Sequence, residues 1–249
     1  MNLIIDAGNS QIKWAVYSGG VLIQKSTIEN WNEFIPAHLR LQYPDLNSVI
    51  ISSVRDIPDI FLASLGNSFS NTVELTPDLN LPISIKYKTP ETLGKDRIAS
   101  AVGGAALYPG HPVLIIDLGT AITIDLVNEN SEFIGGNISP GMSLRFKALE
   151  QFTDGLPLVS PSSQTSLLGE TTTEAIQAGV QQGIAYELDA YINTLINKYN
   201  GLRVILTGGD ASAFVRNLKN PIFVVPNLVL DGLNRILEYQ KDQETGFKG

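Results

Sequence analysis

The chain has 249 residues, of which 43% are hydrophobic and 17% charged, so it contains enough apolar side chains for a folded core. Its formal net charge of -8 disfavours nonspecific binding to nucleic acid or to an anionic membrane, and the absence of cysteine excludes disulfides, thiolate metal sites and cysteine nucleophiles. No signal-like segment precedes the first predicted strand and no apolar run reaches roughly 18 residues, so we expect a cytoplasmic protein that does not span a membrane.

The first predicted elements form a hairpin with a polar turn. Residues 3–5 are apolar and β-prone, and a second strand-like run begins near residue 12. Asp6, Gly8, Asn9 and Ser10 lie between the two runs, and Lys13 follows. Gly8 lets a bound group approach the backbone, and the neighbouring amide, hydroxyl and ammonium groups suit phosphate oxygens. Taken alone, the stretch is equally well an ordinary hairpin whose turn is polar.

The next elements alternate between strands and helices, which predicts an α/β layer architecture. We expect strands over residues 21–27, 48–54, 72–75 and 83–86, and helices over residues 31–41 (despite Pro36), 57–65 and 96–107. Pro109 and Gly110 end the last of these helices, so we place a domain boundary there, with one domain over 1–109 and another over 110–249.

The first hairpin is repeated in the second half. Residues 114–127 resemble residues 3–16 at an offset of 111, and Leu-Ile-Ile-Asp-x-Gly is identical in both copies. Asp117, Gly119 and Thr120 therefore correspond to Asp6, Gly8 and Asn9. A single duplication of this kind predicts two similar domains that face one another across a cleft.

The rest of the second half contains the longest helix signal of the chain, over residues 171–199, with apolar residues every three or four positions and with Gly179 and Gly183 one turn apart. A Pro/Ser-rich loop over residues 156–166 precedes it. We expect strands over 203–206 and 222–225, a closing helix over 228–239, and a frayed tail from Lys241. The pairs Gly135-Gly136 and Pro140-Gly141 are interpreted as turns near a bound nucleotide.

The paired D-x-G-[NT]-[ST] hairpins resemble the phosphate-binding motifs of the sugar kinase, Hsp70 and actin superfamily. Within it, the chain resembles the type III pantothenate kinases over nearly its full length, through four further stretches at residues 93–97, 135–141, 169–172 and 206–209. The resemblance implies two ribonuclease H-like (actin-like ATPase) domains, each a mixed β-sheet with helices. It also implies ATP-dependent phosphorylation of pantothenate to 4'-phosphopantothenate, the first step of coenzyme A synthesis.

The resemblance implies the following nucleotide and metal ligands. Asp6 would hold Mg²⁺, which prefers oxygen ligands. Asp117 would hold a monovalent cation, K⁺ or NH₄⁺. Contacts to ATP and its phosphates would come from the first hairpin and from one hydroxyl of the second: Asp6, Ala7, Gly8, Asn9, Ser10, Gln11, Ile12, Lys13 and Thr120.

The stretch Gly94-Lys95-Asp96-Arg97 matches the family's G-x-D-R motif, which implies pantothenate binding. Asp96 would be the catalytic base and Arg97 would bind the substrate carboxylate, with Tyr87 as a further contact. An aspartate at a helix start also has a structural explanation, since it caps the helix.

One further threonine would reach the substrate bound by the other subunit of a homodimer. The resemblance favours Thr172, but Thr171 and Thr172 stay open, because Thr171 with Glu174 also fits a capping box.

Two other functions are compatible with parts of the sequence. One is a different small-molecule kinase of the superfamily, such as a sugar kinase, against which the G-x-D-R motif and the short chain argue. The other is a nucleotide-binding or regulatory relative without catalysis. The acidic balance and the lack of a helix-turn-helix signal argue against DNA contact, and a filament-forming role would need larger insertions.

Overall fold

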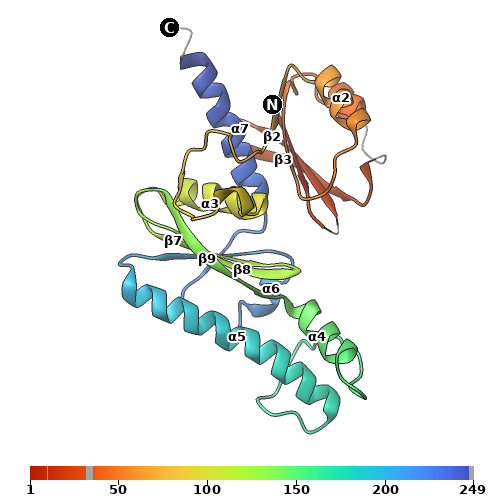
Figure 1. Ribbon diagram of the computed structural model, residues 1–249, viewed down its shortest axis with the longest axis vertical. Helices are drawn as coiled ribbons and strands as arrows, with labels where there is room; N and C mark the ends of the chain where they lie inside the picture. Colours follow the sequence, from red (N-terminus) through yellow and green to blue (C-terminus); the bar gives the residue numbers. More distant parts are fainter. Residues whose placement is uncertain (10, 32–35, 247–249) are drawn as a thin grey trace. The chain divides into compact units, whose positions relative to one another are not determined.

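A computed structural model describes residues 1–9, 11–31 and 36–246 and divides into two compact units (Figure 1). Unit 1 contains residues 1–107, 131–133 and those from 228 onward, and unit 2 contains residues 108–130 and 134–227. The contacts thus group the C-terminal helix with the N-terminal part of the chain, whereas the sequence-based division at residue 109 counts it with the second half. The division into domains stays a prediction.

Unit 1 is built on a five-stranded sheet with the order β3-β2-β1-β4-β5. Strand β1 is antiparallel to β2 and parallel to β4, while β2 and β3 are antiparallel and β4 and β5 parallel. The strands are β1 (Asn2–Ala7), β2 (Ile12–Ser18), β3 (Val21–Ile28), β4 (Ser48–Ser53) and β5 (Asn71–Glu74). Alternate residues of β1, among them Leu3 and Ile5, pack into an apolar core with residues of α1 (Pro36–Gln42) and α2 (Asp59–Ser68).

Two helices of unit 1, α3 (Lys95–Leu107) and α7 (Leu228–Gly246), pack closely against each other (Figure 1). The contact depends on two glycines. A Cβ on Gly232 would overlap the carbonyl oxygen of Ala99, and a Cβ on Gly103 would lie 2.8 Å from the carbonyl oxygen of Leu228. Helix α7 also contacts β1 and β4, so it connects the sheet with the helix that begins at the G-K-D-R motif.

Unit 2 repeats the strand order of unit 1. Its sheet runs β11-β10-β7-β8-β9, with β7 antiparallel to β8 and parallel to β10, and β10 parallel to β11. The strands are β7 (Val113–Leu118), β8 (Ala121–Val127), β9 (Glu132–Pro140), β10 (Arg203–Thr207) and β11 (Phe223–Val224). Replacing β1 to β5 by β7 to β11 reproduces the order of the first sheet, which confirms the duplication predicted from the hairpins.

The apolar core of unit 2 lies between its sheet and the long helix α5 (Thr172–Lys198) (Figure 1). Ile176, Val180, Ile184, Leu188 and Ile192 of α5 pack against residues of β7 and β8. This is the helical spacing predicted from the sequence. Helices α4 (Met142–Gln151) and α6 (Ala211–Phe214) complete the core.

The start of β9 belongs to unit 1, which contains residues 131–133. There β9 pairs with the short strand β6 (Ser84–Ile85). The 3₁₀ turn η2 (Pro90–Thr92) follows β6 along the chain.

Three sequence-based expectations need correction. Helix α7 continues to Gly246, so the frayed tail expected from Lys241 is wrong up to that residue. Gly135 and Gly136 lie within β9, Pro140 ends that strand, and Gly141 precedes α4, so neither pair is a simple turn. Of the helix predicted over 31–41, residues 32–35 lie outside the described residues, and α1 begins at Pro36, a residue suited to the first helical position. Within the described residues, no helix is long and apolar enough to cross a membrane.

Candidate active site

The turn of the β1–β2 hairpin places an acidic and a basic residue opposite each other. Asp6 and Lys13 are paired across the antiparallel strands, so their side chains leave the same face of the sheet. The Gly8 amide donates to the Gln11 carbonyl at 3.0 Å and closes the turn, while Asp6 is half-buried and Lys13 exposed. A Cβ on Gly8 would lie 3.6 Å from that carbonyl oxygen, which is an ordinary contact. The fold itself therefore does not require glycine at position 8, and Ser10 of this turn lies outside the described residues.

The second hairpin presents its aspartate in the same way. Strands β1 and β7 have the same pattern of buried and half-buried residues along their length. Asp6 and Asp117 occupy the same half-buried position near the strand end. The residue opposite differs, because Asp117 is paired with Thr123 where Asp6 is paired with Lys13. The second turn is one residue shorter, and its amide of Gly119 donates to the Ala121 carbonyl at 3.2 Å.

Two glycine-containing loops lie against the second hairpin. Gly208, which follows β10, has φ +92, and a Cβ there would lie 2.5 Å from the Oδ1 atom of Asp117. The amide of Gly141 donates to the Thr120 carbonyl at 3.0 Å, and a Cβ on Gly141 would overlap the Gly119 carbonyl oxygen. Both motifs singled out in the sequence therefore lie within contact distance of the hairpin that carries Asp117 and Thr120.

Asp210 is an acidic residue of this cluster that the sequence analysis did not single out. Its amide donates to the Leu118 carbonyl at 3.0 Å, which ties the residue to the end of β7. Burial raises the pKa of its carboxyl above the ordinary range. The signal that could have found it is its place directly after Thr207-Gly208-Gly209.

The G-K-D-R motif forms the first turn of α3. Asp96 is exposed at the second position of the helix, and its Oδ1 atom accepts a hydrogen bond from the Arg97 amide at 2.8 Å. A Cβ on Gly94 would lie 2.6 Å from the same oxygen, so the glycine makes room for the carboxylate. One of the two carboxylate oxygens therefore accepts from a free amide of the first helical turn, although Asp96 lies within the helix and is not its N-cap residue. Lys95 of the motif forms an ion pair with Glu74 at 3.5 Å.

Arg97 is buried, with 6% of its surface exposed, and lies against two aromatic rings. Its guanidinium carbon is 5.7 Å from the ring centre of Tyr87 and 5.7 Å from that of Phe133. The two rings meet edge to face, with centres 6.0 Å apart and planes at 74°. The structure thus brings Arg97 and Tyr87 together as predicted and adds Phe133, which no sequence motif indicated.

The two candidate threonines have different positions at the start of α5. Thr171 is the N-cap, and its hydroxyl oxygen accepts from the Glu174 amide at 3.2 Å, while the Glu174 carboxylate accepts from the Glu170 amide at 2.9 Å. Thr172 is the first helical residue, and it borders a mainly apolar groove of about 850 Å³. Because the Thr171 hydroxyl serves the cap, this geometry favours Thr172 for contact with a ligand.

The sequence model of the type III pantothenate kinases matches residues 2–194. The chain belongs to this family. It is 44% identical to the type III pantothenate kinase of Cytophaga hutchinsonii over 239 residues, 96% of this chain and 99% of the relative. It is also 44% identical to that of Phocaeicola vulgatus, over 96% of this chain and 98% of the relative. Members of this kinase family are ATP-dependent phosphotransferases.

Solved structures show the fold. A conserved Baf family protein from Campylobacter jejuni is 23% identical, with a TM-score of 0.61 over 96% of this chain and 99% of that chain. A ROK family glucokinase from Streptomyces griseus, in complex with glucose and AMPPNP, is 11% identical, with a TM-score of 0.55 over 96% of this chain and 99% of that chain. At these identities the likeness concerns the fold alone, which is the actin-like ATPase fold of the sugar kinases.

The candidate site contains carboxylates that suit the metals implied by this kinase family. The described residues contain no group of three or more His, Cys, Asp or Glu that could hold a metal ion. Mg²⁺ bound through one or two carboxylates and several waters does not need such a group, so a half-buried Asp6 fits it. Asp117 lies beside the turn closed by the Gly119 amide and is paired with Thr123, so no lysine stands opposite it and a monovalent cation fits there.

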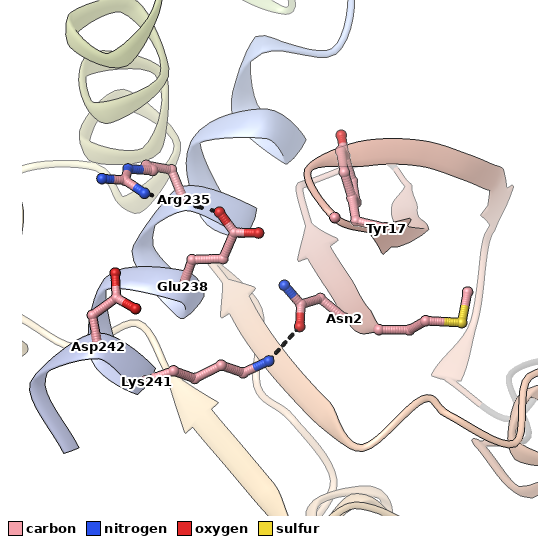
Figure 2. Close-up of a pocket in the computed structure, with 8 residues that line it drawn as sticks. Asn2, Tyr17, Arg235, Glu238, Lys241 and Asp242 are labelled. Atoms are coloured by element: carbon pink, nitrogen blue, oxygen red, sulfur yellow. Dashed lines mark hydrogen bonds and ion pairs between the residues drawn. The ribbon is translucent and has the colours of Figure 1, made fainter. Parts of the chain in front are cut away.

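A polar cavity of about 360 Å³ lies at the other end of the β1–β2 hairpin, against α7 (Figure 2). There the Lys241 ammonium donates to Asn2 Oδ1 at 2.5 Å, Asn2 donates to Asn234 at 2.7 Å, and the Tyr17 hydroxyl donates to Asp231 at 2.5 Å. Burial and the neighbouring Asp231 raise the pKa of Tyr17, and burial lowers that of Lys241. In this kinase the bonds hold α7 to the base of the hairpin whose first strand carries Asp6 near its turn.

Proposed function

We propose that this chain transfers the γ-phosphate of ATP to pantothenate and forms 4'-phosphopantothenate, the first step of coenzyme A biosynthesis. The observation that carries the proposal is the pair of hairpins with aspartates at equivalent half-buried positions, together with the G-K-D-R turn that begins α3. Membership of the type III pantothenate kinase family identifies the acceptor.

The first hairpin is proposed to bind the phosphates. Asp6 would hold Mg²⁺, which supplies charge neutralisation on the transferred group, and the paired Lys13 would place an ammonium beside the phosphate oxygens. The exposed turn residues, with Asn9 among them, offer backbone and side-chain donors, and position 8 has room for a closely approaching ligand. Thr120 of the second hairpin is proposed as a further contact to ATP.

The start of α3 is proposed to bind and activate pantothenate. Asp96 would accept the proton of the attacking hydroxyl, and its hydrogen bond to the Arg97 amide fixes the carboxylate over Gly94. The Arg97 guanidinium would bind the substrate carboxylate, with Tyr87 beside it. Gly94 and Lys95 would complete this contact as parts of the same turn.

Asp117 is proposed to hold the monovalent cation, K⁺ or NH₄⁺. Its carboxylate lies beside the Gly119–Thr120 turn, and the loop at Gly208 contacts the same carboxylate. The threonine opposite it supplies no competing positive charge.

A homodimer is proposed from an exposed apolar surface on unit 2. The groove between α4 and α5 is lined by Ala148, Leu149, Phe152, Leu156, Ile176 and Val180, and Phe152 is 79% exposed. Apolar area of this kind marks interaction sites. Thr172 borders the groove, so it would lie at the interface with a second copy seated here. The cytoplasmic location expected from the sequence stays a prediction.

The function is tested by a coupled assay with ATP, Mg²⁺ and pantothenate, run in K⁺ and then with Na⁺ in its place. We expect turnover in K⁺ that collapses in Na⁺. Asp96→Asn is expected to retain ATP binding and to lose turnover by at least about 100-fold, in line with the loss of a general base.

A substrate panel with glucose and N-acetylmannosamine separates this proposal from a sugar kinase. Phosphorylation of a sugar in preference to pantothenate would contradict the proposed acceptor. A folded protein without turnover on any of these substrates, in either salt, would instead support a regulatory relative.

A further inference from the structure

The site proposed for the substrate carboxylate contains an aromatic residue from outside the G-K-D-R motif. Phe133 is fully buried and lies at the start of β9 in unit 1. The guanidinium carbon of Arg97 and the ring centres of Tyr87 and Phe133 form a nearly equilateral triangle with sides of 5.7, 5.7 and 6.0 Å. The guanidinium therefore lies within cation–π distance of both rings, and the rings interact edge to face.

The backbone holds Phe133 firmly in this position. Strands β6 and β9 pair in parallel with Ile85 opposite Phe133. The Lys86 amide donates to the Phe133 carbonyl at 2.9 Å, and the side chains of Lys86 and Glu132 form an ion pair at 3.2 Å. Tyr87 is the second residue after this short strand. The pairing of β6 with β9 thus sets the distance between the two rings.

Aromatic faces attract a cation without using its hydrogen-bond donors. A guanidinium within about 6 Å of a ring centre is attracted by the electron density of the ring face, and the attraction increases where water is excluded. Arg97 is 6% exposed, so its contacts with the rings are largely desolvated. The five N–H donors of an arginine point outward in the plane of the group, where a carboxylate accepts two of them side by side.

We infer that Phe133 is a positioning residue that, together with Tyr87, orients the Arg97 guanidinium and so sets the preference of the enzyme for an acceptor with a carboxylate over a neutral one. The inference rests on the proposed role of Arg97 as the ligand of the substrate carboxylate. It adds a residue with a stated effect on specificity, which acts through Arg97 and does not touch the reacting hydroxyl.

The experiment compares pantothenate with pantothenol, in which a neutral CH₂OH group replaces the carboxylate. The KM for pantothenate, the kcat and the inhibition constant of pantothenol are measured for wild type, Phe133→Leu and Arg97→Lys. For Phe133→Leu we expect the KM for pantothenate to rise about tenfold, or about 1.4 kcal/mol, with kcat and the pantothenol constant within about twofold of wild type. Arg97→Lys is expected to lose the preference for the carboxylate at least as strongly.

Phe69→Leu is the matched control, because Phe69 is 4% exposed in the core of unit 1 and the substitution removes the same atoms. It is expected to lower thermal stability without changing the ratio of the two constants. As a second measurement, 3,4,5-trifluorophenylalanine at position 133 keeps the shape of the ring but withdraws electron density from its face. Its KM for pantothenate is expected to lie between those of wild type and Phe133→Leu.

Two results would overturn the inference, and they are distinguishable from each other. If Arg97→Lys loses the preference for the carboxylate while Phe133→Leu and the fluorinated ring keep it, Phe133 has only a packing role and the proposed role of Arg97 stands. If Arg97→Lys itself keeps the preference, the carboxylate is bound elsewhere and both assignments are wrong.

Discussion

Asp6 and Asp117 occupy equivalent positions in the two hairpins, and the residue opposite each one suits the role proposed for it. Lys13 opposite Asp6 provides a positive charge where phosphates would bind. Thr123 opposite Asp117 places no ammonium beside that carboxylate, so a monovalent cation proposed there meets no like charge from this position. The two copies of the duplicated motif thus differ in charge at one position of the neighbouring strand, with an ammonium in the first copy and a neutral hydroxyl in the second.

The substitution Thr123→Lys tests this difference. Across paired strands the side chains are about 5 Å apart, where two positive charges repel by roughly 3 kcal/mol at an effective dielectric constant near 20. We expect the K⁺ concentration for half-maximal activity to rise by roughly tenfold or more. This is less than the full repulsion would give, because a flexible lysine can move its ammonium away from the cation. Thr123→Val is the uncharged control. Equal K⁺ requirements in the two variants would argue against Asp117 as the cation ligand.

Asp210 is expected to lower stability at neutral pH. Burial raises the pKa of its carboxyl in the folded protein, so the fold favours the protonated form and is destabilised when the group ionises. The stabilisation from the protonated Asp210 carboxyl is fully present below the ordinary pKa near 4. It is lost as the pH rises through the raised pKa of this carboxyl in the folded protein. Asp210→Asn should therefore increase the melting temperature at pH 7.5, and the gain should shrink as the pH approaches 4.5.

The effect of Asp210→Asn on stability is not complicated by the loss of a helix cap. Within the described part of the chain, the Asp210 side chain makes no capping hydrogen bond to α6 that the substitution could remove. A gain in melting temperature that is constant across this pH range would show that the ionisation of Asp210 is not its cause.

At the scale of elements, α7 links two parts of the proposed site within unit 1. It holds the base of the β1–β2 hairpin through Asn234 and Lys241, as Figure 2 shows for Lys241, and it packs on α3, whose first turn carries Asp96. Gly232→Ala would force a methyl group into the Ala99 carbonyl. We expect this overpacking to cost about 1–3 kcal/mol of unfolding free energy, measured by urea denaturation.

Gly66→Ala in α2 is the matched control for this substitution. No described atom outside its own helical surroundings lies within 4 Å of a Cβ at position 66. Alanine there should stabilise the protein by about 0.5–1 kcal/mol through its helix propensity. A Gly232→Ala protein as stable as the Gly66→Ala protein would mean that α3 and α7 can separate without cost.

Elements with local signals were predictable from the sequence, and elements defined by distant contacts were not. The hairpins follow from apolar runs around a polar turn, and α5 follows from its apolar spacing and from the Thr171 cap. Strand β9 was not predicted from the sequence, because Gly135 and Gly136 are residue types typical of turns. Phe133 and Asp210 gain their importance only from contacts with Arg97 and with the end of β7, which are far away in sequence. Motifs therefore predicted the residues of the candidate site, whose roles stay predictions, but no motif indicated Phe133 or Asp210.

At the scale of the whole molecule, the apolar groove on unit 2 predicts that the protein works as a dimer. Gly179 lies on α5 and lines this groove. Among the described residues outside the local helix, no atom lies within 4 Å of a Cβ at Gly179 or at Gly183. The glycines are thus not needed for packing inside this chain, and they leave a flat helix surface that a second copy can approach closely.

Gly179→Glu should therefore separate the dimer without unfolding the subunit. By analytical ultracentrifugation we expect wild type at twice the chain mass of 27.0 kDa and the variant at the chain mass, since a buried unpaired carboxylate is costly in an apolar interface. The KM for pantothenate should rise as well, because each site would lose the Thr172 of the partner. Gly66→Glu makes the same change at another open helical position and should remain dimeric with an unchanged KM. A wild-type chain that sediments as a monomer at micromolar concentration would contradict the dimer. A Gly179→Glu chain that stays dimeric would place the interface on another surface.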